Sequence, residues 1–163
     1  MKYYLNVGSN IGNRRDHLYR AVVALVAGSS GAAVSRIVES EPWGYESDNR
    51  FLNLGLVIDS DDAPLAMLDR LHDIERQLGS AAHRDAHGNY VDRLVDIDIV
   101  AIDGQTIDLP VLQVPHPRMS QREFFLVPMM ELAPCWRHPV TGLTAAQMLQ
   151  ELKLRQGGLK EGT

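Results

Sequence analysis

The feature that most constrains the fold is an apolar segment at residues 94–101 that is interrupted by two aspartates. Side chains alternate between the two faces of a β-strand, so residues two positions apart share a face. One face is expected to pack on a core and carries only apolar side chains: Val95, Ile97, Ile99 and Ala101. Asp96 and Asp98 share the opposite face, between Leu94 and Val100. The segment therefore predicts a strand with one buried face and one face that carries two negative charges.

The two carboxylates on that second face indicate a metal site. Like charges at this spacing repel each other, and burying them without a partner is costly. A hard cation such as Mg²⁺ removes both problems, because it takes oxygen ligands and commonly shares them with substrate phosphates. The alternative is an edge strand on which Asp96 and Asp98 are simply solvated. The motif alone does not separate these two interpretations.

The order of predicted elements indicates an α+β fold of the ferredoxin-like type. Such a fold has a βαββαβ core, in which an antiparallel sheet carries helices on one face. The strands are predicted at residues 2–7, 34–40, 51–58 and 93–102, and an extended segment ends near residue 114. A C-terminal helix is predicted at residues 144–152 as part of the additions to this core.

Two helices are predicted between these strands from their apolar periodicity. The core face of the first is expected to comprise Leu18, Ala21, Val22 and Leu25, and that of the second Met67, Leu71, Ile74 and Leu78. For the second helix, Asp61 and Asp62 offer an N-cap, Pro64 lies in the first turn, and Gly79 is a plausible stop.

Composition limits the kind of protein. The 163 residues suit one domain spanning 1–163, with an end that frays from about residue 156. The net charge of −5 argues against a nucleic-acid-binding protein. No apolar stretch is long enough for a signal peptide or a membrane span. A single cysteine, Cys135, suits a reducing cytoplasm. We therefore expect a cytoplasmic monomer that acts on small molecules.

A second motif, at residues 114–124, gathers cationic side chains after the aspartate strand. His116, Arg118 and Arg122 lie within this short loop. Arginine offers a rigid fork of donors that matches phosphate oxygens. The loop therefore indicates an anion site, although an ordinary surface loop with a histidine is the alternative.

A third motif indicates a site for a flat heterocycle. Phe51 and Asn53 point the same way from one strand, so a ring could lie on Phe51 while the amide of Asn53 bonds its edge. The alternative is an aromatic core residue with a polar neighbour. Residues 8–13 contain two glycines but lack the lysine of a P-loop. They predict a tight strand-to-helix turn that lets a ligand approach the backbone near Gly8.

Together these segments resemble the 6-hydroxymethyl-7,8-dihydropterin pyrophosphokinase family. The similarity runs from Gly8-Ser9-Asn10 to Glu131-Leu132-Ala133-Pro134 and so covers most of the chain. Its most specific part is the run Asp-Arg-Leu-Val-Asp-Ile-Asp at residues 92–98. Val114-Pro115-His116 follows, and Arg122 stands six residues after that histidine.

The resemblance implies a fold, a reaction and a set of site residues. The fold is ferredoxin-like with additions, and the reaction transfers the diphosphate of ATP to the pterin, with AMP as the second product. The resemblance implies that two Mg²⁺ ions bind to Asp96 and Asp98. It implies ATP contacts from Glu75, Arg93, His116 and Arg122, and pterin contacts from Gly8, Trp43, Phe51, Asn53 and Phe124. Phe51 and Phe124 would stack on opposite faces of the pterin.

The loop at residues 80–92 departs from the family pattern. Many members carry an arginine where this chain has Ala81, and Tyr90 stands where they have a tryptophan. We expect Arg84 to supply the missing catalytic charge, beside Arg93 at the start of the aspartate strand. Two other functions stay open at this point. One is a weakened pterin- or nucleotide-binding module, and the other is a metal-dependent phosphoryl or nucleotidyl transferase with another acceptor.

Overall fold

The central strand of the sheet is β1 (Lys2–Ser9). It pairs antiparallel with β4 (Phe51–Asp59) on one side and with β5 (Asp96–Ile102) on the other. Two short strands, β2 (Gly31–Val34) and β3 (Val38–Ser40), both pair antiparallel with the far side of β4. The computed structural model describes residues 1–40, 50–79 and 94–161, with side chains through residue 157.

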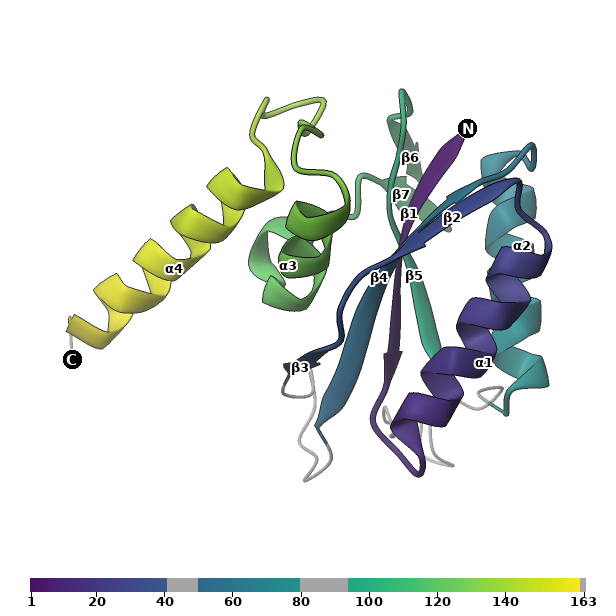
Figure 1. The fold of residues 1–163 in the computed structure, drawn as a ribbon. Helices are drawn as coiled ribbons and strands as arrows, with labels where there is room; N and C mark the ends of the chain where they lie inside the picture. The colour runs from purple at the N-terminus through teal and green to yellow at the C-terminus, as the bar shows by residue number, and fades with distance from the viewer. Residues whose placement is uncertain (41–49, 80–93, 162–163) are drawn as a thin grey trace.

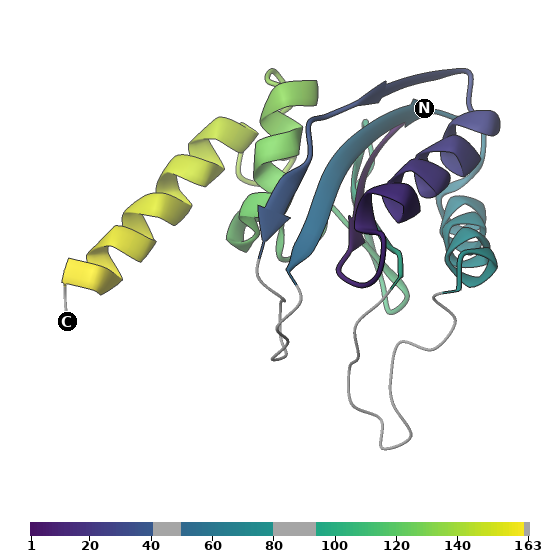
Figure 2. The ribbon, with the colours of Figure 1, turned by 60° about the horizontal axis from the view of Figure 1, so that its bottom comes forward.

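Helices cover both faces of this sheet (Figure 1). On one face lie α1 (Arg14–Ala27) and α2 (Pro64–Gln77). On the other lies α3 (Glu123–Leu132), against which α4 (Ala145–Glu161) packs, as Figure 2 shows from a second side. Between β5 and α3 the chain forms three short elements: β6 (Ile107–Leu109), β7 (Leu112–Val114) and the 3₁₀ turn η1 (Met119–Gln121). The predicted ferredoxin-like core with C-terminal additions is confirmed.

Two apolar clusters hold these layers together. The cluster under α1 and α2 takes alternate residues of β1, including Tyr3, Leu5 and Val7. The cluster under α3 and α4 takes Tyr4 and Val100 from the opposite sheet face. The predicted core faces of both helices are confirmed, since their apolar residues are buried or packed against the first cluster: Leu18, Ala21, Val22, Leu25, Met67, Leu71, Ile74 and Leu78.

The face predicted for Ala101 is wrong, because β5 contains a β-bulge. Tyr4 of β1 pairs with Ala101, whereas the next residue, Leu5, pairs with Ile99. Val100 is therefore the extra residue, and it joins Ala101 in the cluster under α3. The bulge leaves Asp96 and Asp98 on their predicted face, because it lies after them in the strand.

Two boundaries differ from the prediction, and one helix was not predicted. The strand predicted at residues 34–40 is two strands, β2 and β3. The N-cap of α2 is Ala63 and not Asp61 or Asp62, and no side chain caps the helix. The helix α3 was not predicted at all. It contains Pro128, and most of its residues are apolar, so its sequence shows no clear amphipathic period. The expected fraying from residue 156 stays a prediction.

Gly55 allows α3 to approach the sheet closely, and this gives a test of the packing. A Cβ at residue 55 would lie 2.6 Å from Cβ of Pro128 and 3.2 Å from Cδ1 of Leu132. We expect Gly55→Ala to lower the free energy of unfolding by about 1–3 kcal/mol through overpacking. Gly157→Ala is the control, because nothing lies within 4 Å of a Cβ there, and it should be neutral or stabilise α4. Equal denaturant midpoints for both variants would contradict this account.

Candidate active site

Residues from three strands form a row across the sheet face that α3 partly covers. Asn53 of β4 stands opposite Gly8 of β1, which in turn stands opposite Asp96 of β5. Neighbouring strands are about 4.8 Å apart, so Asn53 and Asp96 lie on the order of 10 Å from each other across Gly8. A second row, two residues along, comprises Gly55, Asn6 and Asp98. The predicted third motif and the aspartate pair are therefore brought to one surface.

Gly8 has no side chain, and the side chains of its neighbours lie close to its Cα. A Cβ at residue 8 would lie 2.7 Å from Oδ1 of Asn53 and 3.3 Å from Cδ1 of Phe51. A side chain larger than hydrogen would therefore press on both groups that the sequence assigns to a flat ligand. The interpretation of the turn at residues 8–13 as a place where a ligand can reach the backbone stays a prediction.

The amide of Asn53 is held in one orientation. Its Nδ2 donates to Oγ of Ser40 at 2.8 Å, and the Asn53 side chain is buried. Phe51, two residues earlier on β4, is half-buried and stands on the same face. Ser40 was missed in the sequence, because nothing in its neighbourhood showed that β3 would pair with β4.

Phe124 belongs to the first turn of α3 and is tied to the sheet through its backbone. Nδ2 of Asn6 donates to the carbonyl oxygen of Phe124 at 2.7 Å. The ring of Phe124 is half-buried and meets Phe125 edge to face at 5.1 Å, while the guanidinium of Arg122 lies over both rings. Asn6 was also missed. Its signal was a lone amide inside an apolar strand, on the same face as Gly8.

A cleft of about 380 Å³ runs along the outer edge of β5. Its wall includes Asp96, Asp98, His116 and Glu75, together with residues of the β6–β7 turn. Glu75 projects from α2, is 4% exposed, and its Oε2 accepts the N–H of Ile97 at 3.1 Å. This bond satisfies a backbone donor of the edge strand and fixes one side of the cleft.

His116 is neutral in this setting. Burial, followed by the nearby Arg122 and Arg118, lowers the pKa of His116 from 6.5 to about 4. Its backbone N–H donates to the carbonyl of Val100 at 2.8 Å, and its ring meets Phe125 edge to face. Nδ1 accepts the backbone N–H of Arg118 at 3.1 Å. The proton of the neutral ring therefore sits on Nε2, which makes this atom a hydrogen-bond donor.

The aspartate pair fits a hard divalent cation. Asp96 and Asp98 are half-buried and both line the cleft. Within the described ranges, no group of three or more histidine, cysteine, aspartate or glutamate side chains could hold a metal ion. Two carboxylates leave most coordination positions to water and ligand oxygens, which is how Mg²⁺ is usually bound beside phosphates.

Three of the predicted site residues lie outside the described residues: Trp43, Arg84 and Arg93. The others are divided between two neighbouring regions. Gly8, Phe51, Asn53 and Phe124 belong to the heterocycle motif, and Glu75, His116 and the two aspartates line the cleft. Arg122 lies next to Phe124 and does not line the cleft.

A ferredoxin-like sheet with a flat-ligand surface beside an acidic cleft fits a class of transferases that move phosphate groups from a nucleotide to a small heterocycle. The similarity to known proteins identifies the family within this class. A family model described as 7,8-dihydro-6-hydroxymethylpterin-pyrophosphokinase (HPPK) matches residues 4–134. The chain belongs to this family.

Individual relatives agree with this assignment. The 2-amino-4-hydroxy-6-hydroxymethyldihydropteridine pyrophosphokinase of Porphyromonas gingivalis is 38% identical over 138 residues, which are 83% of this chain and 92% of that protein. The protein of the same name from Bacillus subtilis is 37% identical over 79% of this chain and 76% of its own length. The crystal structure of the Plasmodium falciparum HPPK-DHPS with pteroate has a TM-score of 0.68 at 14% identity. It matches 92% of this chain and 44% of that longer chain, and it shows the shared fold.

The Gly8 position gives a test of the flat-ligand surface. We expect Gly8→Ala to displace Asn53 and Phe51, and therefore to raise the KM for the heterocyclic substrate by roughly tenfold or more, a loss of about 1.4 kcal/mol or more. The KM for the nucleotide should change much less, because the cleft lies on the other side of Asp96. Equal changes in both KM values would show that the substitution acts through general misfolding.

The lowered pKa of His116 predicts a pH dependence of stability. Between pH 6.5 and about 4 the unfolded chain protonates this histidine while the folded chain does not. The free energy of unfolding should therefore fall as the pH drops through this window. His116→Gln should lack this component, so the stability difference between wild type and variant should shrink from pH 7.5 to pH 4. Urea unfolding at several pH values measures it, and a constant difference would refute the assignment.

Proposed function

We propose that this chain transfers the diphosphate of ATP to the hydroxymethyl group of 6-hydroxymethyl-7,8-dihydropterin, with AMP as the second product. Family membership makes it a pyrophosphokinase of folate biosynthesis. The observation that best supports the detailed assignment is the row Asn53–Gly8–Asp96, in which the proposed pterin contact Asn53 and the cleft residue Asp96 stand on either side of Gly8. A heterocycle bound at this row would present its substituent toward the cleft.

On the pterin side, Phe51 and Phe124 would stack on the two faces of the ring. Aromatic stacking adds about 0.5–1.5 kcal/mol beyond the burial of apolar area. Asn53 would read the ring edge, since Ser40 already occupies its Nδ2 and leaves Oδ1 near Gly8 as an acceptor. The absence of a side chain at Gly8 would let the edge of the ring approach the backbone of β1.

On the nucleotide side, the cleft along β5 would hold ATP. His116 would donate from Nε2 to a phosphate oxygen, because its Nδ1 is already bonded to the backbone of Arg118. Glu75 lines the same cleft and would face the nucleoside part of ATP. Arg122 would place its guanidinium toward the phosphates from above the Phe124 ring.

Asp96 and Asp98 would hold Mg²⁺, and the family resemblance implies two ions. When bound, these ions would neutralise phosphate charge and lower the pKa of the attacking alcohol. Arg93 and Arg84, from the segment at residues 80–93, would oppose the charge that grows on the transferred group. The hydroxymethyl oxygen would attack the β-phosphorus while AMP leaves, so positioning and electrostatics would dominate catalysis.

We also propose that the reaction takes place in the cytoplasm, in keeping with a single cysteine, Cys135. Among the described residues, no helix has the length and apolar character that crossing a bilayer requires.

The direct experiment incubates the chain with ATP, Mg²⁺ and the reduced pterin and follows both products. AMP should appear in equal amount to the pterin diphosphate. A release of ADP or of inorganic diphosphate instead would show a different transfer and overturn the proposal.

The aspartate pair provides the matching prediction. Asp96→Asn and Asp98→Asn should each reduce kcat by at least a hundredfold, on the scale of removing one strong electrostatic contact in a transition state. The fold should survive, because an amide in place of one of two like charges does not add repulsion. Asp108→Asn on the exposed β6 strand is the control and should keep wild-type turnover. Near-normal activity in either site variant at ordinary Mg²⁺ concentrations would rule out the metal assignment.

A further inference from the structure

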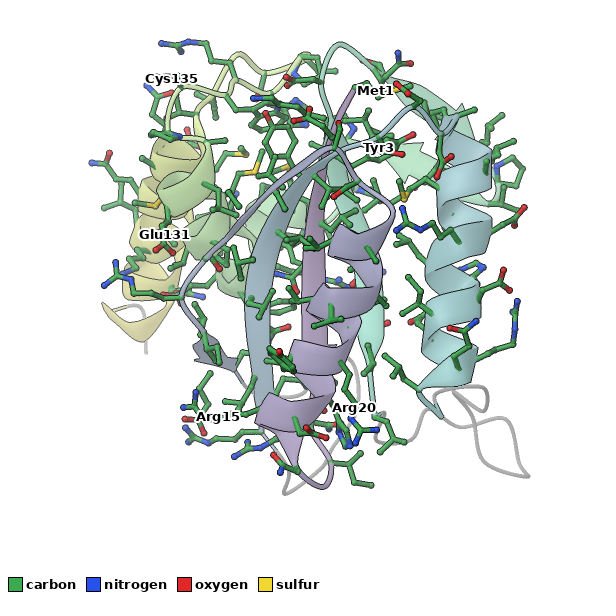
Figure 3. All side chains as sticks on the ribbon, turned by 45° about the vertical axis from the view of Figure 1, so that its right-hand side comes forward. Met1, Tyr3, Arg15, Arg20, Glu131 and Cys135 are labelled. Atoms are coloured by element: carbon green, nitrogen blue, oxygen red, sulfur yellow. The ribbon has the colours of Figure 1, made fainter. Side chains whose placement is uncertain are left out.

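The helix α4 packs against the loop that carries two of the proposed ATP contacts. It lies beyond the segment that the family model matches, which ends at residue 134. Figure 3 shows α3 and α4 together on the side of the sheet away from α1, with Cys135 in the loop between them. Besides α3, α4 contacts the 3₁₀ turn η1, which lies between His116 and Arg122. The end of the chain is therefore in contact with the proposed phosphate site.

The sequence of α4 gives the helix a fixed start and one apolar face. The N–H of Gln147 donates to Oγ1 of Thr144 at 3.2 Å, and the N–H of Thr144 donates to Oε1 of Gln147 at 2.9 Å, which together form a capping box. Four apolar residues then repeat at i, i+3, i+4 and i+7 and are all buried: Ala145, Met148, Leu149 and Leu152. This face is the one that packs on α3 and η1.

The later turns of α4 lie on both sides of Arg122 along the chain. Nη2 of Arg155 donates to the carbonyl oxygen of Ser120 at 3.4 Å, two residues before this arginine. Nζ of Lys153 lies 3.9 Å from Oε1 of Glu123, one residue after it. Leu152 is next to Lys153 in the helix, so it belongs to the part of the apolar face that lies nearest this loop.

Met119 connects the backbone of the loop to α4. Its N–H donates to the carbonyl oxygen of His116 at 3.1 Å, and its own carbonyl oxygen accepts the N–H of Arg122 at 3.3 Å. Its side chain is 1% exposed and belongs to the same apolar cluster as Met148 and Leu152. The position of the Arg122 backbone therefore depends on a side chain that α4 helps to bury.

The guanidinium of Arg122 also lies on this cluster. Its Cζ is 5.0 Å from the centre of the Phe125 ring and 5.6 Å from that of the Phe124 ring. Phe125 is fully buried in the cluster that includes the apolar face of α4. Because a cation is attracted to the face of an aromatic ring, the place of the ring influences the place of the guanidinium. Both the backbone and the side chain of Arg122 are thus supported by groups that pack with α4.

The other proposed ligand contacts in this segment have anchors on the sheet. The backbone N–H of His116 donates to the carbonyl oxygen of Val100 on β5 at 2.8 Å. The carbonyl oxygen of Phe124 accepts Nδ2 of Asn6 on β1 at 2.7 Å. A change in α4 should therefore displace Arg122 more than His116 or Phe124.

We propose that α4 positions Arg122 for the phosphates of ATP, with Leu152 and Arg155 as positioning residues. The inference rests on the proposed function, in which Arg122 contacts those phosphates. Exposed polar contacts such as that of Arg155 contribute little individually, so the burial of Met119 and Phe125 with the apolar face of α4 carries most of the effect. The helix beyond the family model is then needed for the use of ATP as well as for packing.

The first test compares the two substrates. Leu152→Ala should lower kcat/KM for ATP by roughly fivefold or more, while the KM for the pterin stays within about twofold of wild type. Arg155→Gln should act in the same direction by about two- to threefold, as expected for one exposed hydrogen bond. Leu152→Met conserves the volume of the side chain and should restore wild-type kinetics.

Leu25→Ala is the matched control, because it makes the same substitution at a fully buried residue of the other apolar cluster. It should lower the melting temperature but keep kcat/KM for ATP, provided that all variants are assayed well below their melting temperatures. It therefore separates the positioning of Arg122 from a general loss of stability.

The second test asks whether α4 acts through Arg122. Arg122→Gln should lower kcat/KM for ATP by itself. In that background, Leu152→Ala and Arg155→Gln should each lower it little further, because the group that they position is already absent.

Three outcomes would overturn the inference: an unchanged kcat/KM for ATP in Leu152→Ala or in Arg155→Gln, equal losses for ATP and the pterin, or additive losses in the double variants. If Leu152→Ala does not fold, Arg155→Gln decides, since it alters only an exposed side chain. The wild type separates this inference from the proposed function. A wild type that releases ADP defeats the proposed function, whereas a wild type that forms AMP and the pterin diphosphate beside unaffected α4 variants defeats only the inference.

Discussion

The antiparallel pairing of β1 with both β4 and β5 is the constraint on which the rest of the structure depends. Because it sets the register on both sides of Gly8, it decides that Asn53 and Asp96 flank the same residue. A slip by one residue in either pair would turn one of these side chains into the core under α1 and α2. The alternate apolar residues of β1 oppose such a slip, because it would expose them. Tyr3 and Val7, for example, are fully buried in that core.

The two edges of the sheet differ in the side chains that accompany their backbone groups. At the β5 edge, Glu75 accepts the N–H of Ile97, so an outward backbone donor is satisfied by a buried carboxylate from α2. At Ile97 the edge of β5 therefore has no free N–H to offer to a further strand. At the β2 edge no comparable side chain appears among the described residues, and the exposed residues there are small and apolar.

Much of this arrangement could be predicted from the sequence, where a local period carries the information. Alternation placed Asp96 and Asp98 on one face, and the 3.6-residue period found the core faces of α1 and α2. Features that depend on distant partners could not be predicted. The bulge at Val100 arises from the pairing with β1, the role of Asn6 depends on the backbone of Phe124, and α3 is hidden by its uniform apolar composition. Trp43 and Arg93 remain predictions from the family resemblance, and Arg84 remains a prediction from its place in the loop where the chain departs from the family pattern.

Two glycines on one face of the sheet influence how closely other groups approach it. Gly55 leaves a space that Pro128 and Leu132 fill, so α3 sits close enough for Asn6 to bond the carbonyl of Phe124. Gly8, on the adjacent strand, leaves a space bordered by Asn53 and Phe51. The missing side chain at Gly55 allows the helix to approach the sheet, and the backbone at the first turn of the helix is then bonded to Asn6, two residues before Gly8 on β1. A side chain at residue 55 would push Pro128 and Leu132 away from the sheet, and the hydrogen bond between Asn6 and the carbonyl of Phe124 would be strained or lost with them.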